Sequence, residues 1–193
     1  MKIIMEDKRE NILNAATDIF SKYGFYGAKM EDIAKKAEIG KGTIYGYFDS
    51  KQSLFYEMIK YRIEEYEKGL DSSLNIEGSL EEKLYNLYIF HEEYLNRYID
   101  ITQIIMTEQE VLPKELMGEI AAEMDKIFYR IQKSVEEAIH KEELRDNLNP
   151  QLAAIVIIGS IGQFYAQKIC YPEKNHNNVE FKELIDTILK GLQ

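Results

Sequence analysis

Residues 30–54 constrain the fold more than any other stretch, because their apolar positions describe two short helices joined by a tight turn. We expect the first helix from Met30 to Ala37, a turn at residues 38–40, and the second helix from Lys41 to Phe48. The side chains expected to hold these elements together are those of Ile33, Ala34, Ile39, Ile44 and Phe48. An amphipathic helix over residues 6–23, stopped by Gly24, precedes them and is expected to support them.

The rest of the chain reads as longer helices. A fourth helix, from about Ser50 to Leu70, is longer than a small N-terminal domain needs, so we expect it to link two bodies. Further helices are expected after Ser79, over a separate apolar segment 99–112, from Pro113, from Asn149-Pro150, and over residues 180–192. No alternating strand pattern or internal repeat is present, so the predicted class is all-α with about nine helices.

Charge divides the chain into two parts that differ in kind. The formal net charge is −10, yet residues 1–60 carry 10 Lys/Arg against 9 Asp/Glu. Between Lys35 and Lys51 there are four lysines and two acids, a local basic excess on an acidic protein. We therefore expect an N-terminal helical domain, residues 1–50, and a larger helical domain, residues 51–193.

The segment Lys41–Lys51 has the side chains that a helix needs to read the major groove of DNA. Thr43 and Tyr45 offer groups to base edges, and Gly42 lets the backbone come close. Lysines and a tyrosine around them suit phosphates. The predicted DNA contacts are Lys29, Lys36, Lys41, Gly42, Thr43, Tyr45, Tyr47 and Lys51. The alternative interpretation of residues 45–48 is a plain hydrophobic core, which leaves two outward tyrosines beside lysines unexplained.

Residues 29–54 resemble the helix-turn-helix of the tetracycline-repressor (TetR) family. The positions that match its pattern are Asp32-Ile33-Ala34, Ala37, Gly42-Thr43, Tyr45, Tyr47-Phe48, Ser50-Lys51 and Leu54. The chain departs at Lys29, where a capping Thr is usual, at Glu38, which replaces the turn Gly, and at Gly40, which replaces a capping Ser. The resemblance implies a homodimer that binds a palindromic operator in double-stranded DNA, with a C-terminal domain that binds a small effector releasing the repressor.

The last two helices also predict that the chain pairs with a second copy of itself. The helix over residues 150–171 is apolar around most of its circumference, and the helix over residues 180–192 has one apolar face. The alternative is a central helix buried within a monomer. The predicted dimer interface consists of Leu152, Ile155, Val156, Gly159, Gly162, Ile185, Ile188 and Leu189.

Aromatic and Met residues on the inner stripes are candidates for an effector pocket, although each could be plain core. They are Phe90, His91, Tyr94, Ile105, Met106, Met124, Phe128, Ile131 and Phe164. Their chemistry suggests an apolar or aromatic effector. A buried His91 needs a hydrogen-bond partner, whether it binds a ligand or is a satisfied core histidine.

Other classes of protein find little support. No catalytic constellation, cofactor fingerprint or metal-ligand spacing is visible, so we expect neither an enzyme nor a bound cofactor or metal. The single Cys170 and the lack of a signal peptide or a membrane-length apolar run predict a cytoplasmic protein without membrane association. The alternative function is a ligand-independent DNA-binding scaffold that organises the chromosome.

Overall fold

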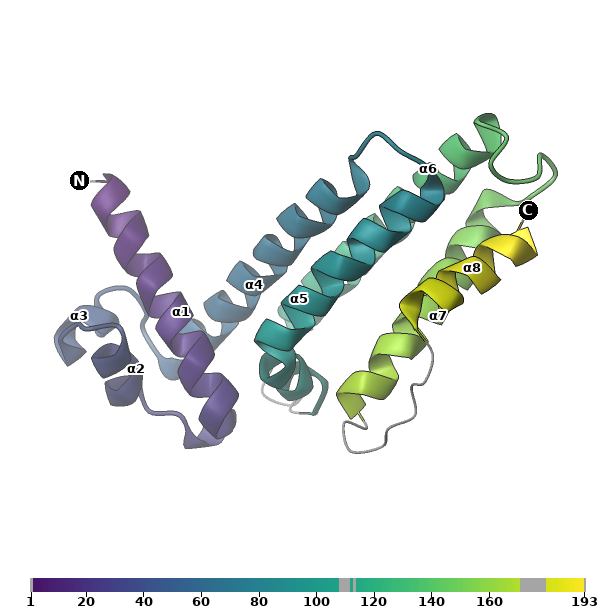
Figure 1. Cartoon of the computed structure of the whole chain (residues 1–193). Helices are drawn as coiled ribbons and strands as arrows, with labels where there is room; N and C mark the ends of the chain where they lie inside the picture. The colour runs from purple at the N-terminus through teal and green to yellow at the C-terminus, as the bar shows by residue number, and fades with distance from the viewer. Residues whose placement is uncertain (1, 108–111, 113, 171–179, 193) are drawn as a thin grey trace. The chain divides into compact units, whose positions relative to one another are not determined.

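The computed structural model describes residues 2–107, 112, 114–170 and 180–192, and in this part the chain consists of helices and short connections, without strands (Figure 1). The side chains described are those within residues 8–103, 112, 114–167 and 180–191. Eight helices are present in the described residues: α1 Lys2–Gly27, α2 Met30–Lys36, α3 Lys41–Tyr45, α4 Lys51–Leu74, α5 Leu80–Thr107, α6 Lys114–His140, α7 Pro150–Cys170 and α8 Phe181–Leu192.

The all-α class is confirmed, and the difference in helix count has a local cause. The segment 99–112 was predicted to be separate, but its first part continues α5. The helix does not end at Tyr98 and runs through a break there (φ −127°, ψ 21°). Thr102 donates its hydroxyl to the Tyr98 carbonyl at 3.1 Å, a side-chain bond of the kind that bends helices. Gly24 interrupts α1 as expected, with φ 66°, and one further helical turn follows it.

Helix α4 begins where the sequence suggested. The Ser53 amide donates to Ser50 Oγ at 3.0 Å, so Ser50 is the N-terminal cap. The helix then continues to Leu74, one turn beyond the expected Leu70.

The chain forms two compact units, and α4, α5 and α6 each contribute to both. The first unit contains Met1–Glu65 and Tyr98–Ile120, and the second contains Tyr66–Arg97 and Ala121–Gln193. Each unit has its own hydrophobic core.

The first core surrounds the short helices. Phe20, Phe55 and Leu54 are almost fully buried at its centre, and the rings of Phe20 and Phe55 meet edge to face with centroids 4.7 Å apart. Ile101, Leu112 and Leu116 belong to the same core, so residues well beyond position 50 support the short helices. Helix α2 packs against α1, and α3 packs against α2 (Figure 1).

The second core is built by α4 and α5 with α6, α7 and α8. Its most buried members include Leu70, Leu84 and Ile157. Helices α7 and α8 pack against each other, as Figure 1 shows. The stacked rings of Tyr88 and Phe181, 3.9 Å between centroids, join α5 to α8.

Candidate DNA-binding surface and effector site

Helix α3 presents its polar residues outward because two apolar residues anchor it. Ile44 is fully buried and Phe48, just past the helix, is 3% exposed. Thr43 is exposed, Tyr45 is 44% exposed, and an added Cβ at Gly42 would meet nothing within 4 Å. These three predicted contacts therefore share one open face. Tyr47, in contrast, is half-buried and packs against the first core.

The turn before α3 is an αL helix ending. Glu38 has φ 57°, the Glu38 amide donates to the Lys35 carbonyl (3.1 Å), and the Ile39 amide donates to the Ala34 carbonyl (2.9 Å). These two bonds are the Schellman pattern, in which glycine normally occupies the αL position. Glu38 therefore occupies a position at which the backbone favours glycine. This preference explains why the helix-turn-helix pattern that residues 29–54 resemble has a glycine there. Lys29 and Gly40, at the N-caps of α2 and α3, make no side-chain cap bond.

Glu38→Gly is expected to stabilise the protein by about 1 kcal/mol, because glycine adopts φ 57° without the clash of a Cβ. Urea unfolding measures the change. Glu10→Gly, in the middle of α1, is the control and should destabilise instead. A loss of stability in Glu38→Gly would contradict this account of the turn.

Two of the predicted phosphate-binding lysines are paired with carboxylates. Lys41 Nζ contacts Glu31 Oε1, and Lys36 Nζ lies 2.9 Å from Asp18 Oδ2. The Lys41–Glu31 hydrogen bond raises the pKa of Lys41 and lowers the pKa of Glu31. Both pairs are exposed, so each is weak and a phosphate can replace the carboxylate. Lys29 is exposed beside them.

Lys51, another predicted DNA contact, binds other parts of its own chain in the structure. Its Nζ donates to the carbonyls of Ala28 (3.1 Å) and Tyr26 (3.3 Å) and lies 4.7 Å from the centre of the Phe25 ring. The ammonium therefore binds the turn that joins α1 to α2. Its contacts in the free protein position the helix-turn-helix.

Lys51→Met is expected to lower the free energy of unfolding by about 1 kcal/mol, because two carbonyls lose a charged donor. Thermal unfolding checks this. Lys35→Met is the matched control, since Lys35 is an exposed lysine of α2 and its loss should leave the stability unchanged. Equal melting temperatures for the two variants would rule out the role of Lys51 in the turn.

A cluster of rings in the second unit brings together three of the predicted effector residues. Phe90, His91 and Tyr94 surround Tyr66 of α4, with ring centroids 5.4, 5.2 and 5.1 Å from its ring. The Tyr66 hydroxyl and His91 Nε2 are 2.8 Å apart. The ring of Tyr165 of α7 stacks on that of His91, with centroids 4.9 Å apart. We call these five residues the aromatic cluster.

Packing at Gly69 shows how tightly this cluster meets α4. A Cβ at Gly69 would lie 2.0 Å from Cε2 of Phe90, so only glycine lets this ring lie on the helix backbone. The sequence alone missed Gly69, Tyr66 and Tyr165. Tyr66 lies on the same side of α4 as Ile59 and Leu70, a spacing that could have identified it.

The remaining effector candidates are scattered. Ile131 and Phe164 are buried in the second core, and Phe128 is half-buried against it. Met124 is 53% exposed and lies outside the aromatic cluster. The side chains of Ile105 and Met106 lie outside the described residues.

Burial lowers the pKa of His91 from 6.5 to about 4, against a smaller opposing effect of the Leu87 carbonyl. Burial also raises the pKa values of Tyr66 and Tyr165. His91 is therefore neutral near pH 7, and its ring is a hydrogen-bonding group without charge.

The free energy of unfolding is expected to fall as the pH drops from 6.5 towards 4. Over this range the unfolded chain binds a proton at His91 and the folded chain does not, a difference of roughly 2 to 3 kcal/mol. Urea unfolding at several pH values measures how the free energy of unfolding depends on pH. In His91→Gln this dependence should lose the contribution of His91, whereas His140→Gln, a control at an exposed histidine, should keep it. Parallel slopes for the wild type and His91→Gln would contradict the prediction.

Helix α7 exposes an apolar face. Leu152 is 59% exposed, Ile155 51% and Val156 47%, and added Cβ atoms at Gly159 and Gly162 would meet nothing within 4 Å. These five residues, here called the α7 face, are therefore uncovered in the single chain. The other three predicted interface residues, Ile185, Ile188 and Leu189, are buried in the second core and support the unit from inside.

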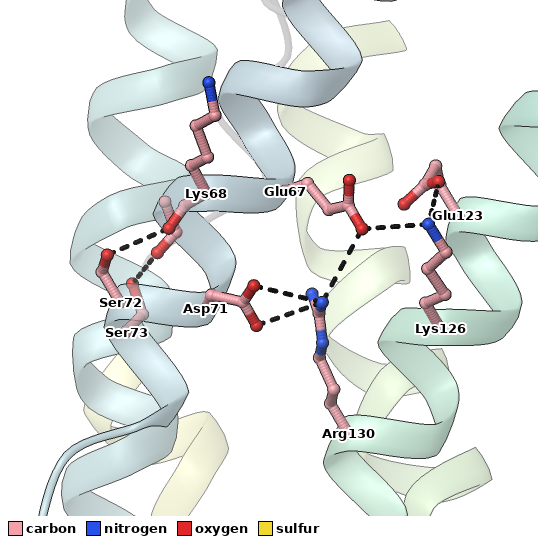
Figure 2. A network of polar contacts seen from close by, with 9 residues as sticks. Glu67, Lys68, Asp71, Ser72, Ser73, Glu123, Lys126 and Arg130 are labelled. Carbon is pink, nitrogen blue, oxygen red and sulfur yellow. Dashed lines mark hydrogen bonds and ion pairs between the residues drawn. The ribbon is translucent and has the colours of Figure 1, made fainter.

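A polar network joins the second half of α4 to α6 (Figure 2). Arg130 Nη2 lies 3.1 Å from Asp71 Oδ1 and 3.7 Å from Glu67 Oε1, and Lys126 Nζ lies 3.0 Å from the same Glu67 oxygen and 2.6 Å from Glu123 Oε1. Shared charges of this kind hold two helices in one register better than an isolated surface pair does.

Among the described residues, no helix is long and apolar enough to cross a membrane.

Comparison with known proteins agrees with this geometry. Residues 12–58 match the sequence model of "Bacterial regulatory proteins, tetR family", and residues 77–166 match "Tetracyclin repressor-like, C-terminal domain". Together these matches span more than half of the chain.

Two relatives and one solved structure cover nearly the whole length. The HTH-type transcriptional regulator YhgD of Bacillus subtilis is 26% identical over 185 residues, 95% of this chain and 93% of that protein. The fatty acid metabolism regulator protein of B. subtilis is 24% identical over 194 residues, 97% of this chain and 98% of that protein. The crystal structure of FadR from B. subtilis in complex with stearoyl-CoA has the same fold, with a TM-score of 0.69 and 20% identity over 94% of this chain and 95% of that chain. The chain therefore belongs to the TetR family of transcriptional regulators.

Proposed function

We propose that residues 1–50 read a palindromic operator and that residues 51–193 bind the effector and form the homodimer. Gly42, Thr43 and Tyr45 approach base edges, because they share the open face of α3. Lys29, Lys36, Lys41 and Tyr47 bind phosphates, and Lys51 positions the turn beside them. The activity is DNA binding without catalysis, and its place is the cytoplasm. The open face of α3 above a buried Ile44 is the observation that carries this proposal.

The α7 face is the proposed centre of the homodimer. It combines exposed branched side chains with two glycines that leave room for a second helix at close range. Dimerisation puts two recognition helices about 34 to 36 Å apart, one turn of DNA, which a palindrome requires.

A fatty acyl thioester is the proposed class of effector. One relative is a fatty acid metabolism regulator, and the solved structure of similar fold contains stearoyl-CoA. The aromatic cluster supports an apolar ligand, because its rings and a neutral His91 offer apolar surface and a single hydrogen-bonding group. A ligand that separates Tyr66 from His91 breaks their hydrogen bond and moves α4. The second half of α4 is joined to α6 by the ion pairs of Glu67 and Asp71.

Selection from a random DNA pool tests the DNA-binding part of the proposal, with a palindrome as the expected result. Fluorescence anisotropy with the selected operator then tests the effector: stearoyl-CoA should release the protein, and free coenzyme A should not. A selected consensus sequence that is not palindromic would contradict the proposal that a homodimer binds the operator. An operator affinity unchanged by stearoyl-CoA and by shorter acyl-CoA esters would contradict the effector class alone.

A further inference from the structure

Arg62 is a buried cation that neither the DNA surface nor the aromatic cluster uses. Arg62 is 4% exposed and lies on the part of α4 that belongs to the first unit. The guanidinium donates to Glu65 Oε2 at 2.6 Å, to the Tyr98 hydroxyl at 2.6 Å and to Asn14 Oδ1. It also lies over the rings of Tyr61 and Tyr98, 4.5 and 4.8 Å from their centres. Arginine alone offers a planar fork of donors for such a site.

The partners of Arg62 come from three helices. Asn14 belongs to α1, Glu65 to α4, and Tyr98 to α5 at its break. The Tyr98 hydroxyl also donates to Glu65 Oε1 at 3.3 Å, which closes a ring of contacts. One side chain therefore joins α1, which packs against α2, to the two helices that continue into the second unit.

The position of these contacts along the helices is informative. Glu65 is the last residue that α4 contributes to the first unit, and Tyr98 is the first that α5 contributes to it. The next residue of α4, Tyr66, makes the hydrogen bond to His91 in the aromatic cluster. A rotation of α4 that breaks this hydrogen bond also changes the direction in which Arg62 points, because both side chains lie on one continuous helix.

Stability alone is a poor reason for a buried arginine. Desolvation of the cation offsets much of what its contacts contribute, and apolar residues of similar volume often replace buried ion pairs without loss. Buried polar contacts of fixed geometry do select one arrangement of the helices that carry them. We propose that Arg62 is a positioning residue that sets the direction of α1, and so of the recognition helix α3, relative to α4 and α5.

Operators of different half-site spacing test this inference, which rests on the proposed palindromic operator. The wild type should prefer its selected spacing over operators lengthened or shortened by one base pair. In Arg62→Met this preference should fall at least about fivefold, the lower end of a typical coupling between sites. The preference against a single wrong base within the half-site should stay the same, because α3 itself is unchanged.

Lys60→Met is the matched control, because Lys60 is a cation of the same helix in an ion pair with Glu119 (3.2 Å) whose side chains are both partly exposed. It removes the same charge and should keep the spacing preference. Tyr98→Phe, which loses only a hydroxyl, should shift the preference in the same direction as Arg62→Met and serves if that variant does not fold.

Equal weakening for all spacings in Arg62→Met and Tyr98→Phe would show a merely structural role and overturn the inference. An unchanged spacing preference in both variants would overturn it as well. A wild type without any spacing preference would contradict the palindromic operator itself, which separates the failure of the proposed function from the failure of this inference.

Discussion

The double variant Ile155→Glu, Val156→Glu is expected to sediment as a monomer at micromolar concentration and to bind a palindromic operator at least a hundredfold more weakly than the wild type. Both side chains are about half exposed in the single chain, so the carboxylates remain solvated in a monomer. In a dimer formed through the α7 face, four carboxylates would be buried without partners, which costs several kcal/mol. Each recognition helix would then bind its half-site alone.

Sedimentation velocity and fluorescence anisotropy measure the two effects. Tyr129→Glu is the matched control, because Tyr129 is an apolar residue of the second unit that is 66% exposed and lies on α6. It should remain dimeric. Thermal unfolding of each variant separates loss of the dimer from loss of the fold. A dimer that persists in the double variant would place the interface elsewhere.

The helices were predictable from the sequence because their apolar residues recur at helical spacing over many turns. The positions of Ile33, Ala34, Ile44 and Phe48 in the first core follow directly from that spacing. The boundary between residues 98 and 99 was predicted, but not that one helix continues through it with a break at Tyr98, where the Thr102 hydroxyl bonds to the Tyr98 carbonyl. The αL turn could be located but not its strain, because a glutamate at position 38 gives no local sign of φ 57°.

The candidate sites were predictable to different degrees. Thr43 and Tyr45 could be placed on an open face, because a helix anchored by Ile44 has only one such side. The partners of the lysines could not be predicted, because Glu31, Asp18 and the carbonyls around Lys51 are brought close to them only by the packing of α1, α2, α3 and α4. The same is true of the aromatic cluster, whose Tyr66 and Tyr165 come from helices far apart in the chain.

Burial of the last helix illustrates a further limit. The apolar stripe of residues 180–192 was correctly recognised, yet a stripe does not say whether its partner belongs to the same chain or to another one. In the structure Ile185, Ile188 and Leu189 face the core of their own unit. Helix α7 is apolar on two sides, and only the side that the core leaves uncovered is available to a second subunit.

Thr43→Ala with Tyr45→Ala is expected to remove most of the sequence discrimination of the protein. Each good base contact contributes about 1 to 3 kcal/mol, so the preference for the selected operator over one with altered half-site bases should fall about 10²- to 10⁴-fold. Binding to DNA of random sequence should change little, because the lysines that bind phosphates are retained.

Tyr23→Ala is the matched control for the larger side chain. Tyr23 is 48% exposed, close to the 44% of Tyr45, but lies on α1 and is not a predicted DNA contact. Competition anisotropy at fixed salt measures both ratios. Because Ile44 anchors α3 from the opposite side, the double variant should retain the melting temperature of the wild type. If it also retains the full preference for its operator, the bases are read by other residues, and the open face of α3 is not the recognition surface.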